Sequence, residues 1–194
     1  MTKQEVYNNI RYNENLVAQY HREIASLNTK ITSRKSLINH LNGQIGELKG
    51  RRQKLEEQLG ELQRLRTKLQ DLRDRFSARQ TKRVTGFNKY NSLALGVRFI
   101  QSYMDGMRDL LSGQEYRNTY NGITAAIDKV NGQIQSKQRE IDSVNSQINT
   151  AQRNIDIARN DINSYRNSIS QRNGDISYRR GRIRYWNDQL KYAT

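Results

Sequence analysis

The fold is decided by residues 127–190, which read IDKVNGQIQSKQREIDSVNSQINTAQRNIDIARNDINSYRNSISQRNGDISYRRGRIRYWNDQL. Isoleucine occupies every seventh position, and Leu190 takes the next place in the series. The nine isoleucines are Ile127, Ile134, Ile141, Ile148, Ile155, Ile162, Ile169, Ile176 and Ile183. A strict seven-residue repeat keeps one stripe of a helix against a partner helix, so the stretch predicts one arm of a left-handed coiled coil. We call the isoleucine position a.

The second stripe of this arm, position d, is only partly apolar. Its members are Val130, Lys137, Val144, Ala151, Ala158, Tyr165, Arg172, Arg179 and Trp186. Coiled coils place apolar side chains at both a and d. Small and basic residues at d therefore predict a thin seam that leaves apolar surface for another element. The seam arginines are interpreted as register devices or as stems that carry their charge to water.

The N-terminal third repeats the pattern with alternating spacings of three and four residues. Its apolar members are Val6, Ile10, Val17, Tyr20, Ile24, Leu27, Ile31, Ile38, Leu41, Ile45, Leu48, Leu55, Leu59 and Leu62, with Asn13, Arg34 and Arg52 as polar interruptions. After Leu62 the series Leu65, Leu69, Leu72 and Phe76 is interpreted as a slip of the phase by a three-residue stammer, which overwinds a coil locally.

These two arms predict an all-α fold, a long antiparallel helical hairpin formed as a coiled coil with a short helical connector at the tip. The prediction is one elongated domain over 1–194, with an arm at 3–80, a connector at 81–112 and an arm at 113–193. Thr2 with Glu5, and Ser112 with Glu115, have capping-box spacing at the two arm starts. The chain has no proline, as long uninterrupted helices require. A parallel coiled-coil homodimer is the alternative.

Composition excludes several functional classes. The 194 residues are only 34% apolar and include no cysteine, so there is no disulfide, thiolate nucleophile or cysteine zinc site. No run of 18 apolar residues is present for a membrane span. The N-terminus lacks the apolar stretch of a secretory signal peptide, so a cytoplasmic protein is expected.

The connector holds the densest apolar cluster in the chain. We expect a turn near 85–91 and then a short helix over 92–111. A short helix cannot bury apolar residues on every side, so this cluster is a candidate partner-binding surface. Its residues are Leu93, Leu95, Gly96, Val97, Phe99, Ile100, Tyr103, Met104 and Met107. A small core that closes the hairpin is the other interpretation.

Positive charge is unevenly distributed along the chain, which has 34 Lys and Arg, 19 Asp and Glu, and a net charge of +15. The candidate basic patch comprises Arg73, Arg75, Arg79, Lys82 and Arg83 near the connector and Arg179, Arg180, Arg182 and Arg184 near the C-terminus. Three interpretations stay open: a solvated surface, an acidic protein partner, and nucleic acid or an anionic membrane surface.

The sequence predicts no enzyme. Its two histidines, His21 and His40, do not form a metal-binding pair, and no nucleotide-binding loop or nucleophile elbow occurs. Isolated carboxylates on exposed helix faces have no environment to prepare them for acid–base chemistry. No catalytic residue, cofactor or metal site is therefore expected.

The stretch GVRFIQSYMDGMRDLLSGQEY at 96–116, between two long polar helices, resembles the YwqH-like small helical proteins of Gram-positive bacteria. These belong to the wider WXG/LXG group of helical hairpins. The resemblance implies an adaptor or chaperone for type VII secretion that binds the helical N-terminal domain of an LXG toxin or another small helical protein. A Tyr-x-x-x-Asp/Glu export signal is absent near Tyr185, so the chain is expected to assist export or to be co-exported.

The function expected from the sequence is thus a non-enzymatic adaptor that forms a hetero-oligomer rather than a homo-oligomer. Two alternatives remain. One is a coiled coil that binds nucleic acid or an anionic surface, and the other is a structural spacer.

Overall fold

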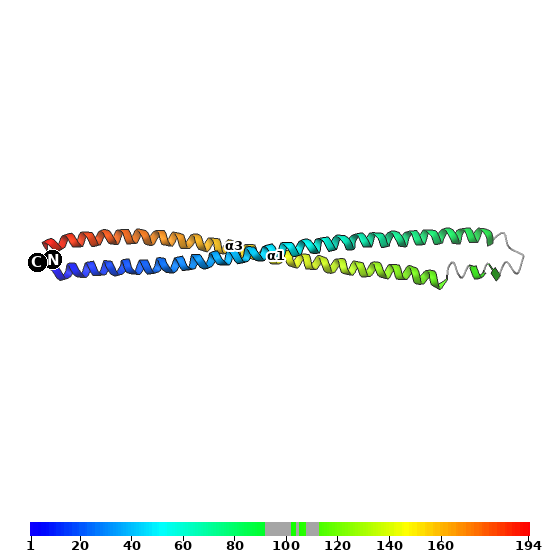
Figure 1. Ribbon diagram of the computed structural model, residues 1–194, viewed down its shortest axis with the longest axis horizontal. Helices are drawn as coiled ribbons and strands as arrows, with labels where there is room; N and C mark the ends of the chain where they lie inside the picture. The colour runs from blue at the N-terminus through cyan, green and yellow to red at the C-terminus, as the bar shows by residue number, and fades with distance from the viewer. Residues whose placement is uncertain (92–101, 104, 108–112) are drawn as a thin grey trace. The chain divides into compact units, whose positions relative to one another are not determined.

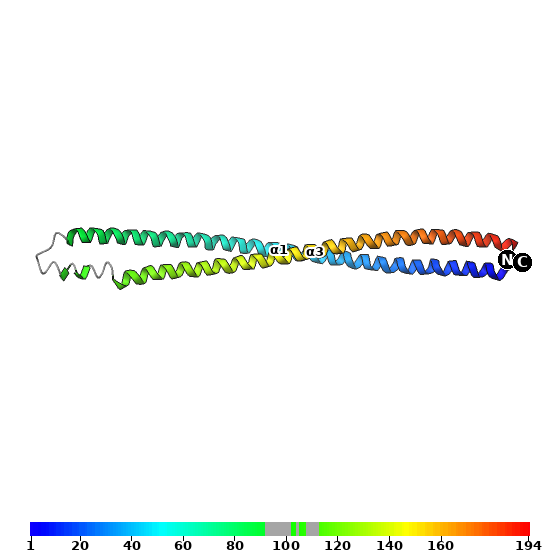
Figure 2. The ribbon, with the colours of Figure 1, turned by 180° about the vertical axis from the view of Figure 1, so that it is seen from behind.

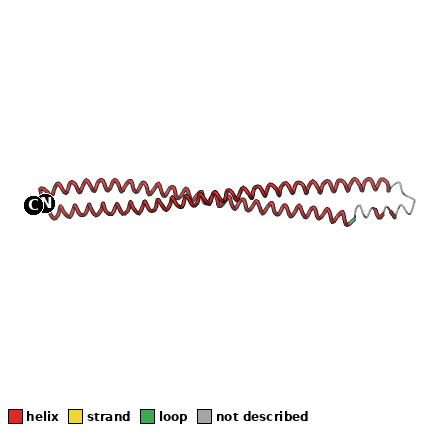
Figure 3. Tube along the Cα trace, in the orientation of Figure 1, coloured by secondary structure: helices red, strands yellow, loops and turns green. Residues whose placement is uncertain are grey.

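The computed structural model describes residues 1–91, 102, 103, 105–107 and 113–194. Helix α1 spans Lys3–Asn91 and helix α3 spans Gln114–Gln189, followed by the short 3₁₀ helix η1 at Leu190–Tyr192. The described residues contain helices and no strand (Figure 3). The two long helices pack against each other antiparallel, which confirms the predicted all-α hairpin (Figures 1 and 2).

Contacts group the chain into two compact units. Unit 1 combines Met1–Leu48 with Ser146–Thr194, and unit 2 is Lys49–Asn145. Each unit pairs one segment of α1 with one segment of α3 (Figure 1). The prediction that residues 1–194 form a single elongated domain stays a prediction.

Unit 1 begins with the predicted capping box. The backbone N–H of Thr2 donates to Glu5 Oε2 at 2.8 Å, and the backbone N–H of Glu5 donates to Thr2 Oγ1 at 3.2 Å. These two bonds satisfy donors that the first helical turn leaves free. The chain ends lie together, because the N–H of Lys3 donates to the carbonyl of Thr194 at 3.3 Å.

The core of unit 1 follows the a and d stripes of both helices. Leu41, Ile45, Ala151 and Ile155 form one buried cluster, in which Ile155 is fully enclosed. Buried a and d positions extend along the rest of the unit. They are Val6, Ile10, Asn13, Ile31, Ala158, Ile162 and Ile176. The alternation of small and large residues at d and a allows the helices to approach closely, as in other two-stranded coils.

Unit 2 has a thinner core, and α1 contributes little to it. The buried residues of α3 are Ile127, Val130, Ile141 and Val144. Of the α1 side chains described in this unit, Leu55 is the only one that is buried. At the far end the ring of Phe76 stacks on Tyr116 with 5.2 Å between centroids. The predicted thin seam is therefore concentrated in this unit.

The predicted stammer after Leu62 is wrong. Leu65 and Leu72 are 44% and 51% exposed, whereas Arg66 and Arg73 are half-buried at the positions that continue the original phase. Gln80 and Phe87, seven residues further at each step, are half-buried as well. Long polar side chains can cover apolar surface with their methylene stems, so they keep the seam continuous without a phase slip.

The first helix also continues further than expected. The predicted arm ended at residue 80 with a turn near 85–91, but α1 remains helical to Asn91. Val84 and Phe87 stay half-buried, so packing continues past Gly86. Of the expected short connector helix, residues 102, 103 and 105–107 are described and are helical. Ser112 and its predicted cap lie outside the described residues.

Candidate partner-binding surfaces

Most of the predicted partner-binding cluster lies outside the described residues. This applies to Leu93, Leu95, Gly96, Val97, Phe99, Ile100 and Met104. The two described members differ in burial, since Tyr103 is exposed and Met107 is half-buried. The role of the cluster stays a prediction.

Unit 2 carries an open groove between its two helices, with a volume of about 490 Å³. Its walls are Gln58, Glu61, Leu62 and Leu65 from α1 and Gln133, Ser136, Lys137 and Glu140 from α3. Leu62 and Lys137 are d residues, and the others come from the side of each helix next to d. The groove therefore follows one edge of the seam.

Two exposed leucines mark the α1 side of this groove. Leu65 lines it directly, and Leu72 lies one heptad further along the same face of α1. Both occupy position g, next to d, where a two-stranded coil needs no apolar residue. Because Arg66 and Arg73 occupy position a in this segment, the apolar residues of α1 lie at d and g. We call Leu65 and Leu72 the leucine stripe.

The seam beside the leucine stripe contains polar donors without partners. Arg66 Nε and Gln80 Nε2 are buried atoms with no hydrogen-bond partner among the described residues. Arg73 pairs with Asp74, its neighbour in the chain, at 3.4 Å, and Lys137 pairs with Glu140 on its own helix at 3.2 Å. The cations of this part of unit 2 are thus not neutralised across the seam.

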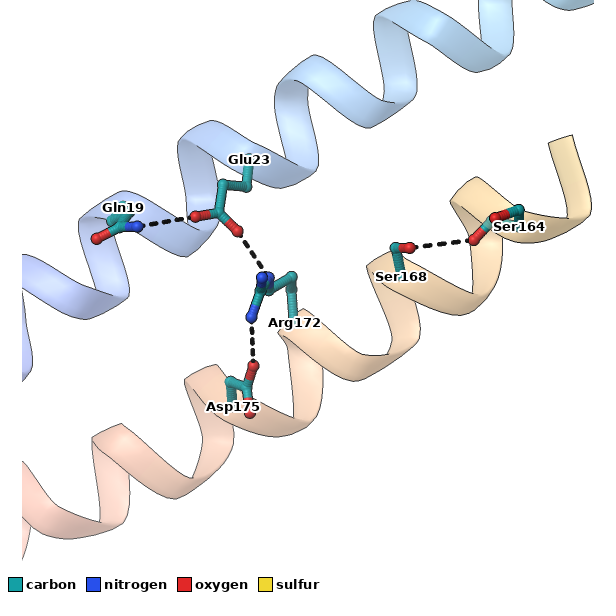
Figure 4. Close-up of polar contacts among 6 residues, drawn as sticks. All are labelled: Gln19, Glu23, Ser164, Ser168, Arg172 and Asp175. Carbon is teal, nitrogen blue, oxygen red and sulfur yellow. Dashed lines mark hydrogen bonds and ion pairs between the residues drawn. The ribbon is translucent and has the colours of Figure 1, made fainter. Parts of the chain in front are cut away.

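In unit 1 a cation of the seam pairs with carboxylates, as Figure 4 shows for Arg172. Arg172 Nε lies 2.6 Å from Glu23 Oε2 on α1, and Arg172 Nη1 lies 3.0 Å from Asp175 Oδ2 on α3. Gln19 Nε2 donates to the other oxygen of Glu23 at 2.9 Å. The hydrogen bond to Asp175, supported by the charge of Glu23, raises the pKa of Arg172 despite some desolvation.

The other predicted seam arginines also have partners on the opposite helix. Arg34 Nε lies 2.9 Å from Asp161 Oδ2, and Arg179 Nη1 donates to Asn13 Oδ1 at 3.3 Å. Arg52, in unit 2, donates to Asn145 Oδ1 at 3.2 Å. These contacts agree with the interpretation of the seam arginines as register devices.

The predicted basic patch consists of two separate groups, one in each unit. In unit 2, Arg75 pairs with Asp71 at 3.0 Å, and the exposed members that follow it are Arg79, Lys82 and Arg83. In unit 1, Arg180 and Arg184 are exposed, while Arg179 and Arg182 are half-buried. The patch therefore corresponds to two surfaces with different surroundings.

Aromatic rings distinguish the basic group of unit 1. The guanidinium of Arg182 lies 5.0 Å from the ring centroid of Tyr185 and 5.3 Å from that of Trp186. Arg179 lies 5.3 Å from Tyr178 and 5.9 Å from Tyr12 on α1. The sequence alone shows that aromatic residues and arginines interleave over 178–186, a combination that could stack bases. Which arginine lies beside which ring, and the contribution of Tyr12 from α1, needed the structure.

Within the part of the chain that the structure describes, His, Cys, Asp and Glu side chains form no group of three that would hold a metal ion. None of the described helices contains a stretch long and apolar enough to span a lipid bilayer. No protein-family model, curated protein or solved structure matches the chain.

Proposed function

We propose that the chain is a non-enzymatic adaptor that binds a helical partner protein, and that the partner adds a third helix to the α1–α3 pair of unit 2. The leucine stripe is the observation that carries this proposal. Leu65 and Leu72 are spaced by one heptad beside an open groove, which is the spacing that a parallel or antiparallel helix would meet with its own apolar stripe.

The charge of the same surface defines the chemistry of the partner helix. The groove itself carries Glu61 and Glu140 beside Lys137. Further along α1, residues 64–79 hold six cations and two carboxylates: Arg64, Arg66, Lys68, Arg73, Arg75 and Arg79, with Asp71 and Asp74. Acidic residues beside an apolar stripe would complement this surface, and they would raise the association rate and the specificity more than the affinity. The expected partner helix is amphipathic and acidic.

The leucine stripe is too small to hold a partner alone. Completing the burial of two half-exposed leucines contributes about 2 kcal/mol, whereas association costs roughly 4–15 kcal/mol. The apolar residues that follow α1 in the chain, from Leu93 to Met107, supply the remaining apolar area in this proposal. The adaptor surface would then extend from the leucine stripe into the connector.

The resemblance of residues 96–116 to the YwqH-like proteins supports a specific partner, the helical N-terminal domain of an LXG toxin. In that role the chain would keep its partner competent for type VII secretion, would be synthesised in the cytoplasm, and would assist export or be co-exported. The complex would be a hetero-oligomer.

Co-expression with the LXG domain encoded in the same genome tests the proposal. We expect one heteromeric species by size-exclusion chromatography with light scattering, and we expect Leu65→Asp with Leu72→Asp to weaken binding at least tenfold. Ile157→Asp is the control, because Ile157 is an exposed apolar residue of unit 1, 58% exposed against 44% and 51% for Leu65 and Leu72. Equal binding by the wild type and the leucine double variant would reject the leucine stripe as the docking surface.

The same measurement separates the alternatives. A chain that stays alone at every concentration with the LXG domain present would favour a structural spacer. A mass that doubles with concentration in the absence of a partner would favour a homodimer.

A further inference from the structure

Exposed aromatic rings gather on one side of unit 1. Tyr178 and Tyr185 lie one heptad apart on α3 and are 61% and 47% exposed, and Tyr12 on α1 is 57% exposed. Seven residues of helix separate Tyr178 from Tyr185 by about 10.5 Å along the axis. Neither tyrosine lies at an a or d position, so the hairpin does not require them. We call Tyr12, Tyr178, Tyr185 and the half-buried Trp186 the aromatic face.

Each ring of the aromatic face has an arginine beside it. Arg179 lies between Tyr12 and Tyr178, and Arg182 contacts both Tyr185 and Trp186. A guanidinium over a ring is attracted by the ring quadrupole, which restrains the aromatic side chain at a modest energy. The rings are therefore held in position before any ligand arrives.

The charge of this surface is not neutralised from within. Residues 176–194 carry five cationic side chains and one carboxylate, Asp188, which pairs with Lys191 at 3.2 Å. Arg180, Arg182 and Arg184 form no ion pair with any described carboxylate. In contrast, Arg172, one turn before this segment, has two carboxylate partners. Of Arg180, Arg182 and Arg184, Arg182 is the one beside the rings, and it remains without a carboxylate partner among the described residues.

We propose that the aromatic face binds single-stranded nucleic acid, with bases stacked on Tyr178 and Tyr185 and a phosphate contacted by Arg182, which lies beside both Tyr185 and Trp186. Alternating rings and cations are the combination by which single strands are bound without sequence preference. A duplex offers phosphates but keeps its bases stacked on each other, so its binding would not use the rings. A helix that lies on a membrane surface buries a broad apolar face of residues such as Trp, Phe and Leu. The exposed rings of the aromatic face are tyrosines, each with a polar hydroxyl.

This inference is independent of the proposed adaptor function, which concerns unit 2. Either proposal can therefore fail while the other holds. The chain could bind a helical partner and no nucleic acid, or nucleic acid and no helical partner. The two sets of variants lie in different units and use different ligands.

Fluorescence anisotropy with labelled dT20 and U20 oligonucleotides tests the aromatic face on the full chain. We expect binding at about 50 mM salt that weakens steeply as the salt concentration rises, because bound counterions are released from the strand. Quenching of Trp186, the only tryptophan of the chain, should report the same affinity, since Trp186 belongs to the aromatic face.

Paired variants separate stacking from charge. Tyr178→Leu with Tyr185→Leu should weaken binding by about tenfold or more, whereas Tyr178→Phe with Tyr185→Phe should retain it, because phenylalanine still stacks. Arg182→Gln should weaken binding more than Arg83→Gln, which removes the same charge from unit 2. Both tyrosines are exposed, so neither replacement should disturb the seam, and circular dichroism checks that the fold is kept.

Four results would overturn the proposal. They are no binding at 50 mM salt, equal affinity for a duplex of the same length, equal losses from the two arginine variants, and unchanged affinity of the tyrosine-to-leucine double variant. Binding of anionic phospholipid vesicles or of polyglutamate in preference to dT20 would assign the face to a membrane or to an acidic protein and would reject nucleic acid.

Discussion

Arg172 on α3 crosses the seam of unit 1 to Glu23 on α1, with 2.6 Å between Nε and Oε2. Asn13 with Arg179, and Arg34 with Asp161, make further cross-seam pairs in the same unit. Sliding one helix by a heptad would separate all of these partners at once, while the apolar repeat alone would tolerate the slip. The polar pairs therefore select one register among several that the isoleucines allow.

The Arg172–Glu23 pair can be tested by charge reversal. Glu23→Arg and Arg172→Glu should each lower the melting temperature, because each places like charges opposite one another. The double variant should recover part of the loss, but not all, because Arg172 also bonds Asp175 and lies over the ring of Tyr20. Thermal unfolding followed by circular dichroism measures the effect.

The control for these charge-reversal variants is an exposed ion pair within one helix. Arg159 and Asp156 are 3.5 Å apart, and both side chains are more than half exposed. Arg159→Glu should change the melting temperature little. A double variant at Glu23 and Arg172 that is less stable than both single variants would contradict the register role.

Removing a large side chain from the buried cluster of unit 1 should lower the free energy of unfolding. Ile155 is fully buried against Leu41, Ile45 and Ala151, so Ile155→Ala should lower the free energy of unfolding by about 2–5 kcal/mol. Ile157→Ala, two residues away on the exposed side, should cost less than about 0.5 kcal/mol. Urea unfolding measures both, and similar losses would show that Ile155 does not lie in the core.

Replacing Arg66 of unit 2 by an apolar residue should not destabilise the protein. Arg66 Nε is buried without a hydrogen-bond partner among the described residues, so Arg66→Leu should stabilise the hairpin by about 1–3 kcal/mol. Arg75→Leu, at a mostly exposed side chain, should have little effect on stability.

Arg66→Leu also separates stability from the proposed adaptor function. If Arg66 recognises an acidic partner helix, the variant should be more stable and yet bind its partner less tightly. A gain in affinity together with a gain in stability would mean that the partner helix does not contact this cation.

Replacing a glycine of α1 by alanine is expected to stabilise the protein. A methyl group at Gly43 would find open space within 4 Å, and Gly43 lies in the middle of a long helix. Gly43→Ala should therefore raise the free energy of unfolding by about 1 kcal/mol. The melting temperature checks this, and a decrease would indicate that another element approaches the backbone at this position.

Sequence reasoning was most successful where each heptad held a branched apolar residue. In α3 and η1 every a and d residue from Tyr116 to Leu190 is at least half-buried, as the isoleucine series predicts. The error in α1 arose from giving leucine more weight than position. Arg66 and Arg73 continue the phase with aliphatic stems, while Leu65 and Leu72, the more apolar residues, lie outside the seam.

The turn expected near 85–91 failed for a related reason. Gly86 lowers helix propensity by about 1 kcal/mol relative to alanine, but it does not end a helix whose seam continues. Val84 and Phe87 remain half-buried on either side of it. Local propensity was outweighed by packing against the opposite helix.

The candidate surfaces could be found from sequence only in part. The cations and tyrosines are visible in the printed chain, but which arginines are neutralised depends on distances across the seam. The contrast between Arg172, with two carboxylate partners, and Arg66, with a buried unpartnered nitrogen, needed the structure.

Because the heptad repeat continues without a slip in both helices, the hairpin can be shortened by whole heptads. Removing seven residues from α1 and the seven that face them on α3 would return every remaining side chain to the same angular position. Each such excision would shorten the paired segment by about 10.5 Å. A graded series of truncated variants would thus act as a molecular ruler, reporting how much span a bound complex tolerates.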